Sequence, residues 1–444
     1  MRKKIGYFAA TLFTATVLIG CNTAGGPAGT PTAAPTGSVQ NTPEPTATAA
    51  PTATAAPTAT TAPTPTEAPK ATPTLVPGRE VVKNPFAYDE MRGLTPKEIV
   101  AEMTVGWNLG NTLDATNGKG LESETSWGNP KTTPEMIETV AAYGFNVLRI
   151  PTTWYNHITD DAYTIDPAWM ARVKEIVDMA FENGMYVILN MHHEDEWQLP
   201  DYEHLDAVKA QQAAMWTQIA TYFGGYGDHL VFEGMNEPRV KGSENEWNGG
   251  TPEGRDCINQ LNQNFIDTVR ATGGNNATRL LLITTYAAAS STGAYKDYVF
   301  PQDANIGLSL HAYTPYRFTY DSKGESWNTA DYTASVQNEI NSVMNDMVLF
   351  AQKGDVPVII TECGSVIKKK KNGVQNFEEV GKWAVGYMEA AKKRHIPCVF
   401  WDNGAFNTSG ENFGLLNRRA LTWYYPDFVN ALSEVYYSEE QDEN

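Results

Sequence analysis

The stretch DPAWMARVKEIVDMAFENGMYVILNM, residues 166–191, places an amphipathic helix directly before a buried strand. Asp166 fits the N-cap position, Pro167 fits the first helical position, and Gly184 follows the last turn. Between them runs an apolar stripe at helical spacing, made of Val173, Ile176, Val177 and Ala180. The next run, 186–191, is apolar at nearly every position, which is typical of a parallel strand covered on both faces. The stretch therefore predicts one helix–strand step of a parallel α/β fold.

Seven further strand-like runs lie before and after this stretch, and helical segments separate them. The runs are 105–109, 147–150, 230–232 continuing to Glu237, 280–283, 306–311, 358–360 and 398–401. Eight strands alternating with helices predict an α/β protein with the (β/α)8 TIM-barrel architecture. An open, doubly wound sheet is the structural alternative, but no glycine-rich phosphate loop follows the first strand.

Two glutamates stand where strand-like runs end, far apart in the sequence. Glu237 closes the fourth run and Glu362 the seventh, and each is followed within two residues by proline or glycine. The C-terminal ends of barrel strands meet at one mouth, so both carboxylates are expected there. Two carboxylic acids that face one substrate form the apparatus of glycosidic bond cleavage, one as proton donor and the other as nucleophile or base.

Other polar and aromatic side chains also gather where the runs end. They are Arg149, His192, His193, Asn236, His311, Tyr313 and Trp401. A single histidine or arginine at a strand end is usually a satisfied structural group. Their coincidence at one mouth indicates a polar site.

The motifs around these residues resemble those of glycoside hydrolase family 5, a (β/α)8 family of retaining enzymes. The motifs are GWNLGNT (106–112), LRIP (148–151), NMHHE (190–194), GMNEP (234–238), HAY (311–313), ITECG (360–364) and WDN (401–403). The run ETSWGNP (124–130) and the arginine after GMNEP are similar to the bacterial endoglucanase and xyloglucanase members of that family. The resemblance spans nearly the whole domain, with every motif in chain order.

The resemblance implies a different role for each carboxylate. Glu237 is expected to be the general acid/base and Glu362 the nucleophile, so one must start protonated near neutral pH and the other ionised. Arg149 and Tyr313 are expected to hold Glu362 as an anion. His311 is expected beside Glu237. A carboxyl separation of about 5 Å would give retention of anomeric configuration, and about 6.5–9.5 Å would give inversion.

The same resemblance implies sugar contacts. Asn236 is expected to bind the sugar 2-hydroxyl, a contact that strengthens in the oxocarbenium-like transition state. Trp401 is expected to form the floor of the −1 subsite, because the C–H face of a sugar packs well on an indole. The remaining expected substrate contacts are Asn111, Trp127, His192 and His193. Tryptophans that follow strands are interpreted as sugar platforms at the mouth: Trp127, Trp154, Trp197, Trp247 and Trp401.

Two features suggest other assignments: a second acid near Glu237, and a pair of neighbouring histidines that could bind a metal. Glu233 would sit roughly 13 Å below the rim at about 3.3 Å per residue, so it is interpreted as a buried, hydrogen-bonded group. The run HHE (192–194) suggests a metal site, but neighbouring strand residues point to opposite faces, which makes joint ligation by both histidines awkward. We expect no catalytic metal and no cofactor, and a structural Ca²⁺ in an acidic loop is left open.

The N-terminal part of the chain has a different composition. Residues 1–20 are basic and then apolar, which is typical of an export signal, and Cys21 follows Leu-Ile-Gly as in the lipobox of bacterial lipoproteins. Residues 21–83 are rich in proline, threonine and alanine and predict an extended tether. Residues 84–444 are expected to form the catalytic domain. The sequence thus predicts an exported protein whose only attachment to a membrane is a lipid on Cys21.

The net charge limits the possible binding partners, and the cysteine count bears on disulfide bonds. The net charge is −19, which argues against nucleic acid or an anionic lipid surface as the main partner and suits an uncharged substrate. Without Cys21 three cysteines remain, an odd number that makes a disulfide framework unexpected. A monomer is expected.

Together these features predict a retaining endo-β-1,4-glucanase acting on a β-1,4-glucan: cellulose-type glucan, mixed-linkage β-glucan or xyloglucan. An endo-β-1,4-mannanase of the same fold is the close alternative. A surface polysaccharide-binding lipoprotein without hydrolysis and a chelator-sensitive, metal-dependent barrel hydrolase are alternatives of other classes.

Overall fold

Eight parallel strands close into a barrel in chain order. The structure is a computed structural model that describes residues 88–320, 329–406 and 411–437. The strands are β1 (Val105–Leu109), β2 (Val147–Ile150), β3 (Tyr186–Asn190), β4 (Leu230–Glu233), β5 (Leu281–Ala289), β6 (Ile306–His311), β7 (Val358–Cys363) and β8 (Cys398–Asp402). Because β1 also pairs with β8, the sheet has no free edge, and the predicted TIM barrel is confirmed.

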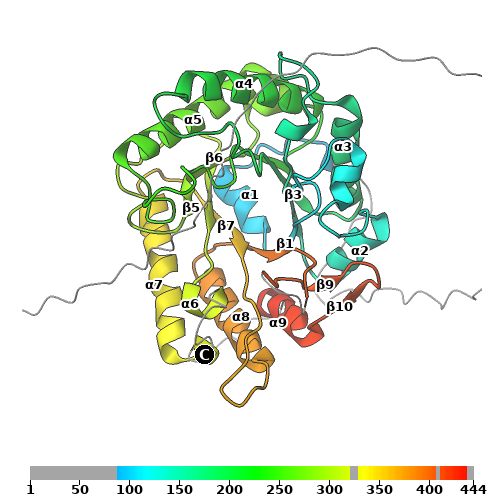
Figure 1. Ribbon diagram of the computed structural model, residues 1–444, viewed down its shortest axis with the longest axis vertical. Coiled ribbons are helices and arrows are strands. Elements are labelled where there is room, and N and C mark those ends of the chain that lie inside the picture. Colours follow the sequence, from blue (N-terminus) through cyan, green and yellow to red (C-terminus); the bar gives the residue numbers. More distant parts are fainter. Residues whose placement is uncertain (1–87, 321–328, 407–410, 438–444) are drawn as a thin grey trace, which may run out of the picture. The chain divides into compact units, whose positions relative to one another are not determined.

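Helices form a ring around these strands (Figure 1). The longer ones are α2 (Pro134–Ala142), α3 (Pro167–Glu182), α4 (Leu205–Tyr222), α5 (Pro252–Ala271), α7 (Ala334–Ala351), α8 (Phe377–Lys392) and α9 (Pro426–Tyr437). Short elements interrupt the loops: α6 (Tyr316–Thr319), the 3-10 turns Leu121–Thr125, Tyr155–His157 and Gly274–Ala277, and the hairpin β9 (Leu416–Asn417) with β10 (Thr422–Trp423). Within the described ranges, no helix is long and apolar enough to cross a bilayer.

Several helices begin with the same local signal, a capping side chain followed by proline. The pairs are Thr95–Pro96, Thr133–Pro134, Asp166–Pro167 and Thr251–Pro252, and each Thr or Asp side chain accepts a hydrogen bond from a backbone N–H of the first turn. Proline costs nothing at this position, since the first-turn N–H groups have no partner inside the helix. The helix predicted from residues 166–184 therefore begins where its sequence indicates.

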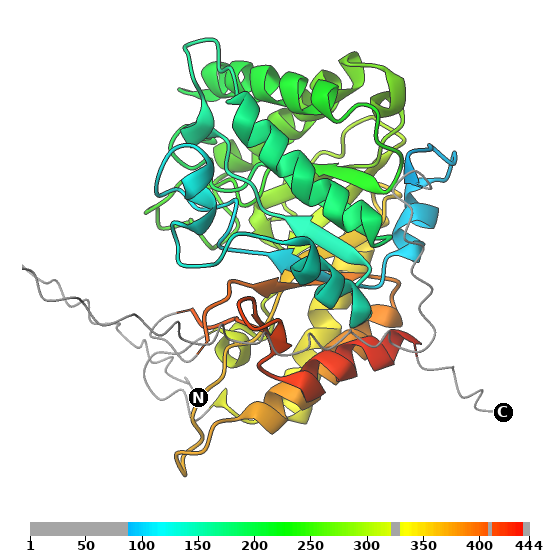
Figure 2. The same ribbon diagram turned by 90° about the vertical axis from the view of Figure 1, so that its right-hand side faces the viewer.

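The first helix, α1 (Pro96–Glu102), lies at one end of the barrel (Figure 2). Its apolar face, with Ile99 and Val100, packs against side chains that the strands direct into the barrel. Those side chains include Val147, Ile188 and Val231, all fully buried. This closes the N-terminal end of the barrel and leaves the C-terminal ends of the strands as its mouth.

The fourth strand is shorter than the sequence suggested. It ends at Glu233, so Asn236 and Glu237 lie on the loop that follows and not on the strand itself. The chain leaves the sheet at Gly234, whose added Cβ would come within 2.6 Å of the Phe265 ring. A side chain at this point would push the loop away from α5, and glycine lets the loop turn inward.

The layer between strands and helices contains Trp216, which is fully buried. Its ring packs against Phe232 and Phe265, and its Nε1 donates a hydrogen bond to the Gly234 carbonyl at 3.2 Å. This helical tryptophan therefore belongs to the core.

We expect Trp216→Ala to lower the free energy of unfolding by about 3–5 kcal/mol, because it removes a large buried ring and leaves a cavity. Urea unfolding followed by circular dichroism measures this. The matched control is Trp247→Ala: this exposed ring lies over Arg239 at 4.5 Å, a contact worth about 0.5–1 kcal/mol. Equal losses in the two variants would contradict the proposed core role.

The signal at 1–20, the lipidation site Cys21 and the tether at 21–83 lie outside the described residues.

Candidate active site

The mouth of the barrel gathers the predicted polar side chains. Arg149 lies on β2, His311 on β6, Glu362 on β7 and Trp401 on β8. The others follow strands directly: His192 and His193 after β3, Asn236 and Glu237 after β4, and Tyr313 after β6. The barrel therefore brings residues separated by more than 200 positions, such as Arg149 and Glu362, into direct contact.

The guanidinium of Arg149 is the centre of the hydrogen-bond network. Its Nε donates to Glu233 at 2.7 Å, and Nη1 donates to Asn108 at 3.0 Å and to Glu362 at 2.7 Å. Its Nη2 donates to Glu233 at 3.2 Å and to Asn236 at 2.8 Å. An arginine has five N–H donors, so all of them have partners here. Because the side chain is fully buried, the plane of the guanidinium is fixed.

Glu362 is held from two sides. Its Oε1 accepts from Arg149, and its Oε2 accepts from the Tyr313 hydroxyl at 3.0 Å. Burial raises the pKa of Glu362; the charges of His311 and Arg149 oppose this rise, and the negative charge of Glu237 adds to it. The two predicted partners of Glu362 are therefore in place.

His311 links the two carboxylates. Its Nδ1 lies 2.8 Å from Oε1 of Glu237 and 3.4 Å from Oε2 of Glu362. Burial disfavours a charged imidazole, but the two carboxylates outweigh burial and raise the pKa of His311. Burial likewise opposes ionisation of Glu237, yet the hydrogen bond and charge of His311, with Arg239, hold the pKa of Glu237 below its usual value.

These directions differ from the simple expectation of a protonated Glu237 and an ionised Glu362. The reason is the position of His311: the charges of two carboxylates favour its protonated form, and its hydrogen bond and charge favour the ionised form of Glu237. Its Nδ1 faces Glu237 across a direct hydrogen bond, so the proton is one transfer away from the predicted general acid.

The two carboxylates are close enough for one sugar to lie between them. Side-chain oxygens of Glu237 and Glu362 lie within 4.8 Å of each other, with a nitrogen of His311 equally near. This distance between the oxygens is well below the carboxyl separation of inverting glycosidases, about 6.5–9.5 Å, and agrees better with the shorter separation of retaining ones, about 5–5.5 Å.

Trp401 and His192 form one wall of the site. Their rings are parallel, with an interplanar angle of 3° and centroids 5.7 Å apart. Burial lowers the pKa of His192, so this ring is neutral at pH 7. Gly110 lies against the indole: an added Cβ there would come within 2.8 Å of the Trp401 ring. Trp401 keeps 8% of its surface exposed, whereas Trp107 and Trp154 have none.

Trp127 and His193 stand next to this wall. Their rings are 5.6 Å apart and tilted by 52°, and both are partly exposed. Asn111 lies on the loop after β1 in the left-handed region, at φ 53°. Its backbone N–H donates to Asp114 at 2.9 Å, and its carbonyl accepts from Asn129 at 2.9 Å. The structure thus places all three predicted contacts at the mouth.

The prediction that Trp154 is a sugar platform is wrong. The side chain is fully buried, and its Nε1 donates to the Asn190 carbonyl at 2.8 Å. Trp197 is partly buried and donates to Glu194 at 2.6 Å, so its indole is held against the protein. Trp247, in contrast, is 59% exposed on the loop after β4.

The expectation that His192 and His193 point to opposite faces of a strand is also wrong. Since β3 ends at Asn190, these residues are not on the strand, and their rings meet edge to face with centroids 4.5 Å apart. Ligand-type atoms of both lie within 4.8 Å of one another and of Asp114. The Asp114 carboxylate already accepts two backbone N–H groups, at 2.6 and 2.9 Å, and we assign no metal ligand here.

Two further residues of the site, Arg239 and Glu194, have no role predicted from the sequence. Arg239 donates to the Glu237 carbonyl at 2.8 Å and lies 3.6 Å from its carboxylate. Glu194 is buried and accepts from the Trp154 N–H at 2.6 Å; burial raises its pKa to about 7. Arg239 directly follows the motif GMNEP, and Glu194 is the last residue of the motif NMHHE. Their position in or beside these motifs is the sequence feature that could have identified them. The three described cysteines, Cys257, Cys363 and Cys398, are buried and unpaired, as expected.

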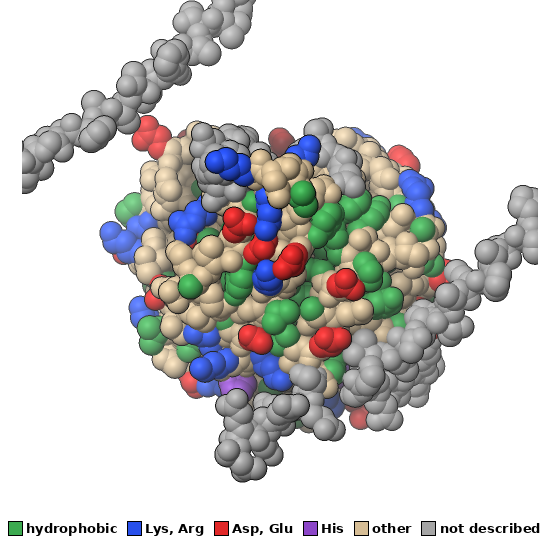
Figure 3. All heavy atoms as spheres, turned by 90° about the horizontal axis from the view of Figure 1, so that it is seen from below, with side chains coloured by type: hydrophobic (Ala, Val, Ile, Leu, Met, Phe, Trp, Pro, Cys, Tyr) green, Lys and Arg blue, Asp and Glu red, His purple; other side chains and the backbone are tan. Residues whose placement is uncertain are grey.

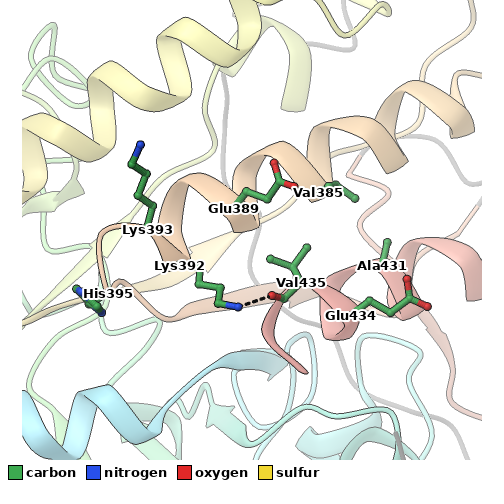
Figure 4. A pocket seen from close by; sticks show the side chains of 8 residues that line it. All are labelled: Val385, Glu389, Lys392, Lys393, His395, Ala431, Glu434 and Val435. Atoms are coloured by element: carbon green, nitrogen blue, oxygen red, sulfur yellow. Dashed lines mark hydrogen bonds between the residues drawn. The ribbon is translucent and has the colours of Figure 1, made fainter. Parts of the chain in front are cut away.

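Two surface grooves lie on the outside of the barrel along α8 and α9. One, of about 740 Å³, runs between Lys392, Lys393 and His395 on one side and Glu434 on the other, with Lys392 bonded to the Val435 carbonyl at 2.9 Å (Figure 4). The other, of about 1040 Å³, is lined by aromatic residues that include Phe377 and Tyr425. The surface seen from below Figure 1 carries acidic and basic side chains side by side (Figure 3). Neither groove includes a residue of the mouth.

Comparison with known proteins agrees with this site. Residues 111–407 match the family model described as cellulase (glycosyl hydrolase family 5). Endoglucanase A of Ruminococcus albus is 50% identical over 347 residues, which cover 78% of this chain and 94% of that protein. Endoglucanase A of Clostridium longisporum is 42% identical over 366 residues, covering 80% and 69%.

Solved structures agree as well. A GH5-4 broad-specificity endoglucanase from Ruminococcus champanellensis with bound cellotriose superposes with a TM-score of 0.73 at 45% identity, covering 77% of this chain and 99% of that one. A GH5 xyloglucan-specific endo-β-1,4-glucanase from a metagenomic library, in complex with cellotriose, gives 0.71 at 44% identity, covering 76% and 98%. With the barrel and the paired carboxylates in place, the chain is a glycoside hydrolase that belongs to glycosyl hydrolase family 5.

Proposed function

We propose that this protein is a retaining endo-β-1,4-glucanase. The observation that carries the proposal is the pair of carboxylates within 4.8 Å of each other, one of which is held by Arg149 and Tyr313. The endoglucanase activity of the relatives supports the same conclusion.

In the first step, an oxygen of Glu362 attacks the anomeric carbon while Glu237 gives its proton to the glycosidic oxygen. The bond from that carbon to the leaving sugar breaks, and a glycosyl ester on Glu362 forms. In the second step, Glu237 takes a proton from water, whose oxygen attacks the same carbon and releases Glu362. Two inversions at one carbon give net retention.

The proton for the first step starts on His311 in the free protein. Transfer from its Nδ1 to Glu237, across 2.8 Å, produces the neutral general acid. A sugar between the carboxylates excludes water from the pair, and exclusion of water favours neutral over charged partners. His311 thus stores the proton, and Glu237 delivers it.

The remaining residues position the sugar. The Oδ1 of Asn236 accepts from Arg149, so its NH2 group is free to donate to the sugar 2-hydroxyl. Trp401 with His192 supplies the stacking wall, and Trp127, His193 and Asn111 line the neighbouring subsites. The partly exposed aromatic rings at the mouth suit a neutral, polymeric glucan.

The substrate class follows from the relatives whose complexes hold cellotriose and from the xyloglucan-specific one. We propose cellulose-type glucan, mixed-linkage β-glucan and xyloglucan as substrates. Cys21 is proposed to carry a lipid that anchors the exported protein, with residues 21–83 as tether. Loss of labelled palmitate incorporation in Cys21→Ala, expressed in a bacterial host, tests the anchor.

Reducing-sugar release by the full chain from carboxymethylcellulose, barley β-glucan, xyloglucan and mannan tests the function. We expect cleavage of the three glucans with the β-anomer as first product by NMR. Cleavage of mannan alone would replace the proposal with a mannanase. Tight binding of glucan without cleavage would indicate a binding lipoprotein, and loss of activity with a chelator would indicate a metal-dependent hydrolase.

A further inference from the structure

Glu233 is a buried acid that the proposed chemistry does not use. It is the last residue of β4, four positions before Glu237, and none of its surface is exposed. Its Oε2 accepts from Nε of Arg149, while its Oε1 accepts from Nη2 of Arg149 and from the Ser309 hydroxyl at 2.5 Å. Ser309 is in turn 2.6 Å from the Thr361 hydroxyl on β7.

The contacts of Arg149 divide into two sides. Glu233 occupies the side formed by Nε and one hydrogen of Nη2, a two-bond fork that fixes the plane of the guanidinium. The other hydrogens reach Glu362 and Asn236, the proposed nucleophile and 2-hydroxyl ligand, as well as Asn108. The orientation of both substrate-facing groups therefore depends on the fork with Glu233.

We propose that Glu233 is a positioning residue that acts through Arg149: it aims Glu362 and Asn236, and it sets how much of the guanidinium charge Glu362 receives. The inference rests on the proposed function. Two carboxylates compete for one guanidinium cation. A stronger ion pair of Arg149 with Glu233 therefore means a weaker ion pair of Arg149 with Glu362.

The charge on Glu362 depends on every group that faces it. These are Arg149 from β2, His192 from the loop after β3 at 4.0 Å, Glu237 from the loop after β4, and His311 and Tyr313 from β6 and its loop. Among them Arg149 is the direct cationic partner at 2.7 Å, and Glu233 is its other anionic partner. Arg149 is therefore the side chain that joins Glu233 to the carboxylate of Glu362 by direct hydrogen bonds.

The test is the pH profile of kcat/KM on soluble β-glucan, because its acidic limb reports the ionisation of the nucleophile in the free enzyme. Glu233→Gln keeps the shape and one acceptor but removes the negative charge. Arg149 then pairs more fully with Glu362, which favours the ionised carboxylate. We expect the acidic limb to move to lower pH by roughly one unit, with a fall in kcat because a less basic nucleophile is less reactive.

Ser309→Ala is the second variant, with the opposite expected sign. Without the hydroxyl donor, Glu233 draws more strongly on Arg149 and leaves less of its charge for Glu362. The acidic limb should then move slightly to higher pH. This variant deletes one oxygen and keeps the ion pair, so it carries the test if Glu233→Gln does not fold by circular dichroism.

The matched control is Glu124→Gln. Glu124 is another buried glutamate that pairs with an arginine through two bonds of 2.8 Å, to Arg172, away from the reacting groups. Its loss should reduce stability and leave the acidic limb where it is.

Opposite shifts in the two variants with a fixed limb in the control support the inference. An unmoved limb in Glu233→Gln and in Ser309→Ala, with activity falling only as the folded fraction falls, would overturn it and leave Glu233 a structural residue. The wild-type protein distinguishes failure of the proposed function from failure of the role of Glu233. If the wild type cleaves no glucan, the proposed function is wrong. If the wild type is active and the acidic limb stays in place in both variants, only the role of Glu233 is refuted.

Discussion

Glu362→Ala should lower kcat on glucan by about 10⁴-fold or more, because the reaction loses the atom that forms the covalent intermediate. The cavity left by the carboxylate lies among Arg149, Tyr313 and His311, two hydrogen-bond donors and a cationic ring that attract a small anion. Azide should therefore restore turnover of an activated aryl cellobioside. Since azide attacks from the side of the missing carboxylate, the product should be the α-glycosyl azide.

The control for this variant is Glu378→Gln, an exposed acid on α8 that pairs with Lys382 at 2.7 Å. Surface pairs of this kind contribute little to stability, so activity should stay at the wild-type level. Retention of more than about a hundredth of wild-type activity by Glu362→Ala without azide would assign the nucleophile to another residue.

The loss of activity in Glu237→Ala should depend on the leaving group of the substrate. Polysaccharide cleavage should fall by about 10²–10⁴-fold, because the leaving sugar needs a proton. A dinitrophenyl cellobioside needs none, so its glycosyl-enzyme should form rapidly and then accumulate, since no base activates water. We expect a fast burst followed by slow turnover.

Azide distinguishes the two glutamates by stereochemistry. In Glu237→Ala it should react with the ester on Glu362 from the opposite face and give the β-glycosyl azide, the reverse of the result for Glu362→Ala. Identical anomers from the two variants, determined by NMR, would refute the assignment of separate roles. The same measurement tests retention, since two opposite azide products require a covalent intermediate on one face.

The sequence was sufficient for the barrel because each strand is short, apolar and bounded by helical segments. The runs at 105–109, 147–150 and 306–311 coincide with β1, β2 and β6 in the structure. The sequence predicts a fourth strand that continues to Glu237, because nothing in the run itself distinguishes Gly234 in a strand from Gly234 in a turn. Its turn depends on the Phe265 ring from α5, a contact between distant parts of the chain.

The paired carboxylates followed from strand ends and motifs, but their protonation did not. It depends on His311 lying between them, and therefore on the register of β6 against β7, which places His311 opposite Glu362. The burial of Trp154 could not be predicted from the sequence either, because its hydrogen-bond partner Asn190 is 36 residues away in the chain. Sequence patterns identify which residues reach the mouth, whereas pairings across the barrel decide what each one does there.

The contact between Gly110 and Trp401 bears on efforts to make the protein more heat-resistant. Replacing glycine with alanine is a common route, since it restricts the unfolded chain. Gly381, inside α8 with no atom within 4 Å of an added Cβ, suits this treatment. At Gly110 the same methyl group would displace the indole on which a glucose ring is proposed to rest. Alanine is therefore expected to stabilise the protein at position 381, whereas at position 110 it would disturb the sugar-binding wall without a gain in stability.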